Sequence, residues 1–375
     1  MSSRAPESAL VAAKVPPETG SVEEEPDAVV LDQWVTPDIA DNRGVLLAGQ
    51  ALEWMDVAAT LAASRYCRTR VLTVSIDGVN LRHPLRVGSA LRMMAHVAHT
   101  SARGLGVSVR ALTHDQTVMT AFITFVSVDH MGDVLPVTAL PDQNGDAPVG
   151  STESSAACRA GESYRELRRR LLAGAVPQLP ERWTRHKPKK AWARIFHEVQ
   201  QMPGAISRAF LRMRNHTQSD RRRQSYVHAV EPVRVHELNF QHTLYGGTIV
   251  RWLGRSAEQS ARRWLGQEPV RLIAIHGLTY LRPARSNHCV HVHSMVVHTG
   301  EHSVTTLVEV YAEDPVGGDA FQAVRAFMSY APLRDCEIPS IDCIDDGERA
   351  LYAEVVQHLE MQSLIGTVES VNASY

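Results

Sequence analysis

The sequence carries one residue pattern twice, and this duplication limits what the chain can fold into. Ile76-Asp77-Gly78 matches Ile275-His276-Gly277 at an offset of 199 positions, and slightly upstream Gly49 matches Gly247 at an offset of 198. A period this long spans a whole small domain rather than one unit of a solenoid. We therefore expect two copies of one domain, paired within the chain as a pseudo-dimer.

Length and composition fit two globular domains. The 375 residues allow two domains of about 100 residues and leave roughly 150 for tails and a connector. No apolar run approaches the ~18 to 20 residues that cross a bilayer. The five cysteines form no CxxC pair, which favours reduced thiols. Glu7 and the run at 23–25 argue against a transit peptide, so we expect a cytoplasmic protein, with a mitochondrial location as the alternative.

Each copy predicts one long helix followed by four strands. In the first copy the helix is expected at 50–66 and the strands at 71–81, 90–100, 106–113 and 118–128; in the second, the helix is expected at 248–265 and the strands at 270–280, 289–298, 303–312 and 321–330. Extended segments at 30–41 and 233–238 precede the helices, and a tail helix is expected at 346–361. One helix with an antiparallel meander is an α+β plan.

We expect five segments along the chain. These are a disordered N-terminal tail (1–27), a first domain (28–134), a basic and partly helical connector (135–225), a second domain (226–335) and a C-terminal tail with a helix (336–375). Within the connector, residues 181–223 hold twelve Lys or Arg against three acidic residues. Such a run attracts polyanions, nucleic acid included, although a solvated connector is an equally good interpretation.

Two strings of residues carry a motif-level resemblance. Residues 43–56 read RGVLLAGQALEWMD and residues 239–247 read NFQHTLYGG. With 74–77, 83–88 and 282–283, they resemble the acyl-CoA thioesterases of the double-hotdog fold. The resemblance implies two tandem hotdog domains, each an antiparallel sheet wrapped around a long central helix. It further implies hydrolysis of fatty acyl-CoA to free fatty acid and coenzyme A without a cofactor, by a homo-oligomer that is a trimer of double hotdogs.

The resemblance also assigns catalytic roles to residues of this chain. Thioester hydrolysis needs an activated water and donors that hold the developing oxyanion. In this family an acidic residue on the helix activates the water, and Asp56 matches that residue. A side-chain amide and a backbone N–H lie beside the thioester carbonyl in the family, and Asn239 and Gly247 match these two positions. The alternatives are structural: Asp56 could interact with its own helix dipole, and Asn239 could cap a turn.

The two copies differ at these positions. Gly254 stands where Asp56 would recur, and Asp41 stands where Asn239 would recur, so we expect one working site and one inactive or ligand-only site. Further substrate-binding candidates are Gly246, His242, Ser303, Ala58 and Ala62. His242 replaces a glycine of the family and is either a substrate contact, a base or a partly buried structural histidine.

Two other functions stay open. A catalytically inactive hotdog could bind acyl-CoA or act as a scaffold, with RNA held by the connector, and an enoyl-CoA hydratase could use His242 as its base. Serine-hydrolase, zincin and nucleotide-phosphate motifs are absent from the sequence. His288, His291 and His293 share one predicted strand, but no carboxylate or cysteine cluster joins them, so we expect no metal site.

Overall fold

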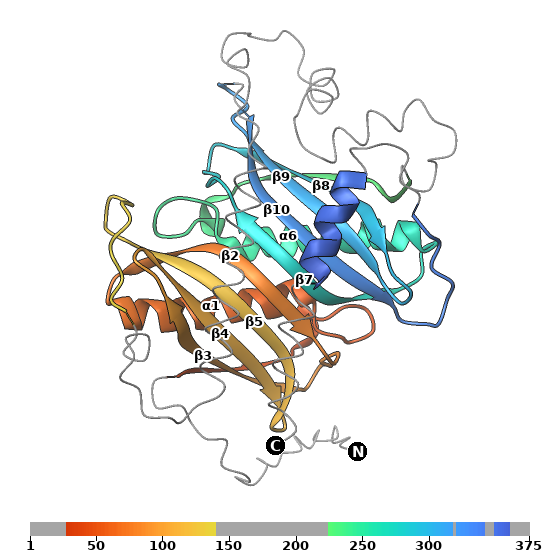
Figure 1. Ribbon diagram of the computed structural model, residues 1–375, viewed down its shortest axis with the longest axis horizontal. Helices are drawn as coiled ribbons and strands as arrows, with labels where there is room; N and C mark the ends of the chain where they lie inside the picture. The colour runs from red at the N-terminus through yellow and green to blue at the C-terminus, as the bar shows by residue number, and fades with distance from the viewer. Residues whose placement is uncertain (1–27, 140–223, 318–319, 342–348, 361–375) are drawn as a thin grey trace, which may run out of the picture.

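A computed structural model describes residues 28–139, 224–317, 320–341 and 349–360. Within them, the strands form one ten-stranded antiparallel sheet in the order β1-β3-β4-β5-β2-β7-β10-β9-β8-β6, curved around two long helices (Figure 1). The connector segment 181–223 and its expected helices lie outside the described residues.

Both halves of the sheet are built in the same way. The first domain contains β1 (Val29–Trp34), α1 (Ala48–Cys67), β2 (Arg70–Leu81), β3 (Ala90–Thr100), β4 (Gly104–Thr113) and β5 (Gln116–Val128). The second contains β6 (Val227–Pro232), α6 (Gly246–Trp264), β7 (Val270–Tyr280), β8 (Cys289–Thr299), β9 (Val304–Glu313) and β10 (Ala320–Pro332). The expectation of two tandem hotdog domains is confirmed.

The extended segment expected at 233–238 was wrong. The strand that precedes α6 is β6, and the chain then forms a short 3-10 turn, Val235–Glu237. The Glu237 carboxylate accepts a hydrogen bond from the Arg234 backbone N–H at 2.9 Å. This bond and the one from the Glu237 backbone N–H to the Arg234 carbonyl at 3.0 Å stabilise a turn rather than an extended chain.

The duplicated motif forms the joint between the domains. Strands β2 and β7 pair antiparallel, with Ile76 opposite Leu278 and Val79 opposite Ile275. The two copies of the motif therefore pair with each other and are related by a pseudo-two-fold axis. This pairing joins the two half-sheets into one continuous sheet.

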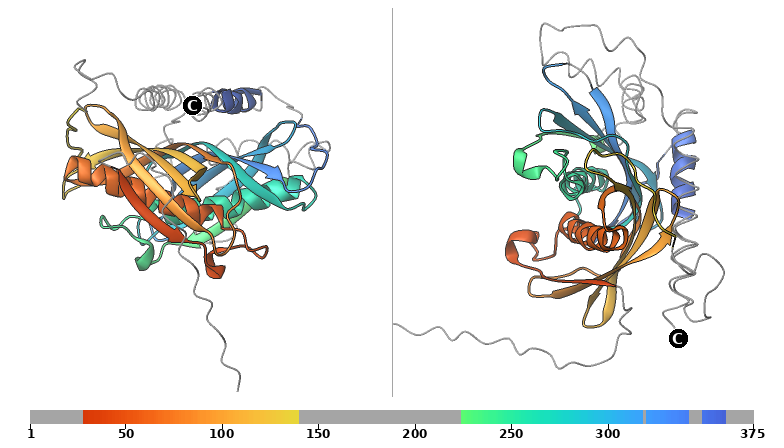
Figure 2. Two further views of the ribbon diagram at one scale, coloured as in Figure 1. Left: turned by 90° about the horizontal axis from the view of Figure 1, so that it is seen from below. Right: turned by 90° about the vertical axis from the view of Figure 1, so that its left-hand side faces the viewer.

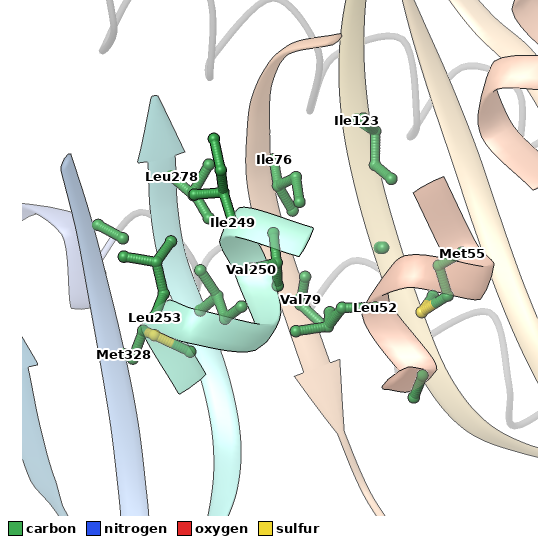
Figure 3. Packing of buried hydrophobic residues seen from close by; sticks show 14 of the residues in the cluster. Leu52, Met55, Ile76, Val79, Ile123, Ile249, Val250, Leu253, Leu278 and Met328 are labelled. Atoms are coloured by element: carbon green, nitrogen blue, oxygen red, sulfur yellow. The ribbon is translucent and has the colours of Figure 1, made fainter. Parts of the chain in front are cut away.

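Both helices cover the same face of this sheet and lie side by side (Figure 2). Residues of α1, α6 and the strands beneath them belong to a single hydrophobic cluster that spans both domains, and Figure 3 labels members from each helix and from the central strands. Small side chains such as Ala58 and Ala62, both buried, let α1 lie close to its sheet. The two domains therefore share one core.

Glycine permits the close approach of α1 to α6. A Cβ atom added to Gly49 would lie 2.8 Å from the Arg251 Cα, and one added to Gly247 would lie 2.7 Å from the Glu53 Cγ. Each helix thus presents a glycine to the other, and an ion pair joins the Arg251 guanidinium to the Glu53 carboxylate at 3.5 Å.

The expected tail helix is present at 349–360 and packs on the opposite face of the second half-sheet (Figure 2). Val355 joins Met295, Leu307 and Phe327 in a separate small cluster, and Arg325 bonds Glu354 at 2.7 Å. None of the helices in the described ranges combines the length and apolar character needed to cross a membrane.

The same substitution should have opposite effects at two helix positions. Gly49→Ala should lower the free energy of unfolding by about 1–3 kcal/mol, because the methyl group meets backbone. Gly254→Ala should raise it by about 0.5–1 kcal/mol, because a Cβ there meets nothing within 4 Å and alanine favours the helix. Urea denaturation of wild type and both variants measures the two changes in the free energy of unfolding. A Gly49→Ala variant more stable than wild type would contradict the close contact between the helices.

Candidate active site

Asp56 is a buried carboxyl in the middle of α1, with 1% of its surface exposed. The Thr73 hydroxyl on β2 donates a hydrogen bond to its Oδ1 at 3.0 Å. Its other oxygen, Oδ2, is buried and lacks a hydrogen-bond partner among the described residues. An ionisable group in this setting lowers the stability of the fold, and such groups cluster at functional sites.

Burial raises the pKa of Asp56 to about 6, and the Glu53 charge acts in the same direction. The hydrogen bond from the Thr73 hydroxyl opposes the shift by favouring the charged form, and the nearby Tyr245 hydroxyl acts in the same direction. Burial and the nearby Asp56 charge raise the pKa of Tyr245, and likewise that of Tyr280. At neutral pH the carboxyl is therefore mostly charged, and the two phenols keep their protons.

Asn239 is fixed by the turn that precedes α6. Its side-chain Oδ1 accepts hydrogen bonds from the Gln241 backbone N–H at 2.9 Å and from the Thr243 backbone N–H at 3.2 Å. The Thr243 hydroxyl donates a third at 3.1 Å. These contacts orient the amide, so that its NH₂ group points away from the turn as a donor.

The Asn239 turn of the second domain lies against the first domain. The Arg70 guanidinium of β2 stands over the Phe240 ring, 5.0 Å from its centroid, and a Cβ on Gly132 would lie 3.3 Å from the Gln241 side chain. Tyr245 is the N-cap residue of α6, and its side chain makes no hydrogen bond to the first N–H groups of the helix. The first N–H groups of α6, that of Gly247 included, are thus free to donate and carry the positive end of the helix dipole.

The pseudo-symmetric position holds a cavity and has a different chemistry from the surroundings of Asp56. A cavity of about 680 Å³ is lined by Asp41, Gly254, Leu272 and Tyr330, among others. The Asp41 Oδ1 accepts the Arg43 and Val45 backbone N–H groups, each at 2.9 Å, so it makes the same turn as Asn239. Its Oδ2 accepts from the Arg43 guanidinium at 2.8 Å, and the side chain offers no donor.

Two of the polar groups around Asp56 have apolar counterparts at this second site. By strand register and helix offset, Leu272 replaces Thr73 and Leu47 replaces Tyr245. The Tyr330 hydroxyl donates to the Gly254 carbonyl at 3.1 Å, in the region where a carboxylate would stand. At the positions equivalent to Asp56 and Asn239, the second site therefore has a glycine and a carboxylate without an NH₂ donor, while Glu258 and the Gln50 amide line the same cavity.

The other sequence candidates have different positions. The Gly246 carbonyl accepts from the Tyr280 hydroxyl at 3.1 Å, beside the start of α6. His242 is exposed, so the interpretation as a partly buried histidine was wrong; its backbone has φ 56°, the left-handed form that glycine adopts most easily and that Gly44 adopts in the first domain at φ 72°. An exposed turn residue gives no support to a hydratase base.

The structure does not bring Ser303 to this site. Ser303 lies in the β8–β9 turn, where its backbone carbonyl accepts from Gly300. Thr299 of the same turn contacts Ile341, and Pro339 contacts Trp264, the last residue of α6. The turn is therefore at the end of α6 opposite to Gly246. The expectation that Ser303 contacts substrate at this site was wrong.

Sequence reasoning missed Thr73, Tyr245 and Tyr280. A signal was present, because Thr73 and Tyr245 are polar in one copy and are leucine in the other. That difference coincides with the difference between Asp56 and Gly254.

Comparisons with known proteins agree with this architecture. The thioesterase superfamily matches the chain twice, at residues 43–120 and 241–318. A mouse acetyl-coenzyme A thioesterase is 32% identical over 108 residues, which are 27% of this chain and 19% of that protein. A human cytosolic acyl coenzyme A thioester hydrolase is 27% identical over 121 residues, 30% of this chain and 32% of that protein. The chain thus spans about a third or less of the length of these two relatives.

A solved structure matches both domains at once. A Lactobacillus plantarum protein assigned as an oleoyl thioesterase aligns with 82% of this chain and 97% of its own, with a TM-score of 0.51 and 10% identity. At that identity the likeness concerns the fold alone. It extends the match to the tandem arrangement of two hotdogs.

Asp56→Asn should stabilise the protein at neutral and basic pH. As pH rises from about 4 to 6 the unfolded carboxyl loses its proton before the folded one, so wild type loses stability in this range. The variant lacks that loss and should unfold with a free energy about 1–3 kcal/mol higher near pH 8, with a smaller difference near pH 4.5. Urea denaturation at both pH values tests this, and a destabilised variant at pH 8 would mean that the carboxylate is held by stronger partners.

Proposed function

Because residues 43–120 and 241–318 each match the thioesterase superfamily, we propose that the protein is an acyl-CoA thioesterase that hydrolyses fatty acyl-CoA to free fatty acid and coenzyme A. The observation that carries the proposal is the buried Asp56 carboxyl, held by Thr73 near the start of α6. The names of the mouse and human relatives support the coenzyme A thioester as substrate class.

We assign one composite active site to the interface between the two domains. The first domain supplies Asp56, and the second supplies the Asn239 amide and the Gly247 backbone N–H. Contacts between Arg70 and Phe240, and between Glu53 and Gly247, support this arrangement because they hold the Asn239 turn and the start of α6 against the first domain.

The proposed reaction proceeds by direct attack of water. Asp56, through the unpartnered Oδ2, takes a proton while the water oxygen bonds to the thioester carbonyl carbon. The Gly247 N–H and the Asn239 NH₂ group donate to the developing oxyanion, which the dipole of α6 also stabilises. The tetrahedral intermediate then collapses with cleavage of the C–S bond, and the departing coenzyme A thiolate receives the proton held by Asp56.

The remaining assignments are predictions. Ala58 and Ala62 are buried on α1, where small side chains would set the room for an acyl chain, and His242 on its exposed turn would reach only the outer part of a substrate. A cytosolic location, assembly as a trimer of double hotdogs, and nucleic acid binding through 181–223 also remain predictions.

The first test is release of free coenzyme A thiol from a series of saturated acyl-CoAs. Wild type should turn over, with kcat/KM rising with pH and levelling above about pH 6, because Asp56 must be charged to act as base. Asp56→Asn should lower kcat by ~10²-fold or more. Gly254→Ala, at the equivalent position of α6, is the matched control and should keep wild-type turnover. No thiol release by wild type at any chain length would instead favour the inactive binding protein.

Asn239→Asp tests the second half of the composite site. Asp41 makes the same turn with a carboxylate, so the variant should keep its fold and its melting temperature within a few degrees. It loses the NH₂ donor, and kcat should fall by ~10²–10³-fold. Full activity in a folded Asn239→Asp protein would remove Asn239 from the mechanism.

A further inference from the structure

Three histidines of the second domain gather at the edge of the sheet. His228 lies on the edge strand β6, directly opposite His293 on β8, and His291 is two residues before His293. The residue after His293 on β8, Ser294, contacts Ser256 of α6, so by alternation His293 and His291 point to the face away from α6. The cluster is therefore separate from the candidate active site.

The three imidazoles bring ligand atoms close together. One ring nitrogen from each residue lies within 4.8 Å of the other two. The His228 Nε2 is 3.1 Å from the His291 Nδ1. The His228 ring stacks on that of His293, with centroids 4.3 Å apart. Two imidazolium ions at such separations would repel, so the stack favours the neutral form, which is the form that binds metal.

Outer partners fix the two buried rings. The His291 Nε2 is 2.8 Å from the Glu313 carboxylate, which leaves its Nδ1 facing His228. The His293 Nδ1 is 2.7 Å from the Tyr226 hydroxyl, and its Nε2 is buried with no partner among the described residues. A histidine that binds metal through one nitrogen and donates the other N–H to a carboxylate or hydroxyl is the usual arrangement at metal sites.

We propose that His228, His291 and His293 form a binding site for a divalent transition-metal ion of the zinc class. The ligand atoms are the His228 Nε2, the His291 Nδ1 and the His293 Nε2, with Glu313 and Tyr226 as outer partners. Three imidazoles leave a fourth position for water, and nitrogen donors favour zinc over magnesium or calcium. His228 is half-buried and gives the ion access to the site.

Binding needs a modest rearrangement of the rings. Tetrahedral zinc places its nitrogen ligands about 3.3 Å apart, so the widest pair must close from at most 4.8 Å. The rings of His228 and His293 are within 5° of parallel, and they must turn about their Cβ–Cγ bonds to aim at one ion. His228, on an edge strand, has the freedom to do so.

The cluster is a property of this domain rather than of the fold. At the equivalent strand pair of the first domain, Val30 lies opposite Met94, and Arg92 pairs with Asp32 at 3.0 Å. The proposal departs from the expectation of no metal site, which considered His288 in place of His228. His288 instead accepts the Arg285 backbone N–H at 2.8 Å and packs edge-on against Phe321.

The test is a titration of the full chain with Co²⁺ alone, after removal of metal with a chelator. Wild type should bind one ion per chain, with the visible absorption bands of four-coordinate cobalt, and Zn²⁺ should displace it. His228→Ala should weaken binding by ~100-fold or more, and Glu313→Gln by about 10–100-fold. His302→Ala, which removes a histidine that is 85% exposed, is the matched control and should bind as wild type does.

Two outcomes would overturn the proposal. One is the absence of a saturable one-to-one complex in wild type, and the other is equal affinity in wild type and His228→Ala, since surface histidines would then hold the ion. Melting curves of the metal-free variants verify that each is folded. Because the experiment measures metal binding, its result for the metal site does not depend on whether the protein hydrolyses thioesters.

Discussion

The pairing of β2 with β7 is the constraint on which the remaining structure depends. Four residue pairs join these strands, and they turn two half-sheets into one surface with two helices on the same side. The helices can then meet only where Gly49 and Gly247 remove the side chains between them. As a result the start of α6 lies against α1, with Gly247 beside Glu53, and the proposed composite site depends on this approach.

Because the two domains are related by pseudo-symmetry, the two sites can be compared within one chain. The two sites share the fold, the turn and the helix crossing, yet only the first has a carboxyl at the Asp56 position, where α6 has Gly254. At the other, leucines stand in place of Thr73 and Tyr245, and Tyr330 donates to the backbone of Gly254. Loss of the carboxylate and loss of its polar surroundings thus occur together, as expected when a charge no longer has to be solvated in the interior.

Much of this architecture could be predicted from the sequence, because the repeat and the alternation of apolar residues are local signals. Asp56 and Asn239 were identified as candidates by their motifs. Thr73 was not, because its role depends on β2 passing over α1, and the raised pKa of Asp56 depends on burial that a one-dimensional pattern does not contain. His228 escaped notice for the same reason: it is far from His291 in sequence, and only the register of β6 on β8 brings them together.

The Asn239 turn has a consequence for the lifetime of the protein. Asparagine side chains deamidate slowly in water, and the product at this position would be an aspartate in a turn that already accommodates one at Asp41. Hydrolysis of the amide to aspartate would exchange one NH₂ group for an oxygen and keep the turn, whereas the isoaspartate that also forms on deamidation would lengthen the backbone there. Molecules that carry the aspartate would resemble, at their proposed active site, the inactive half of the same chain.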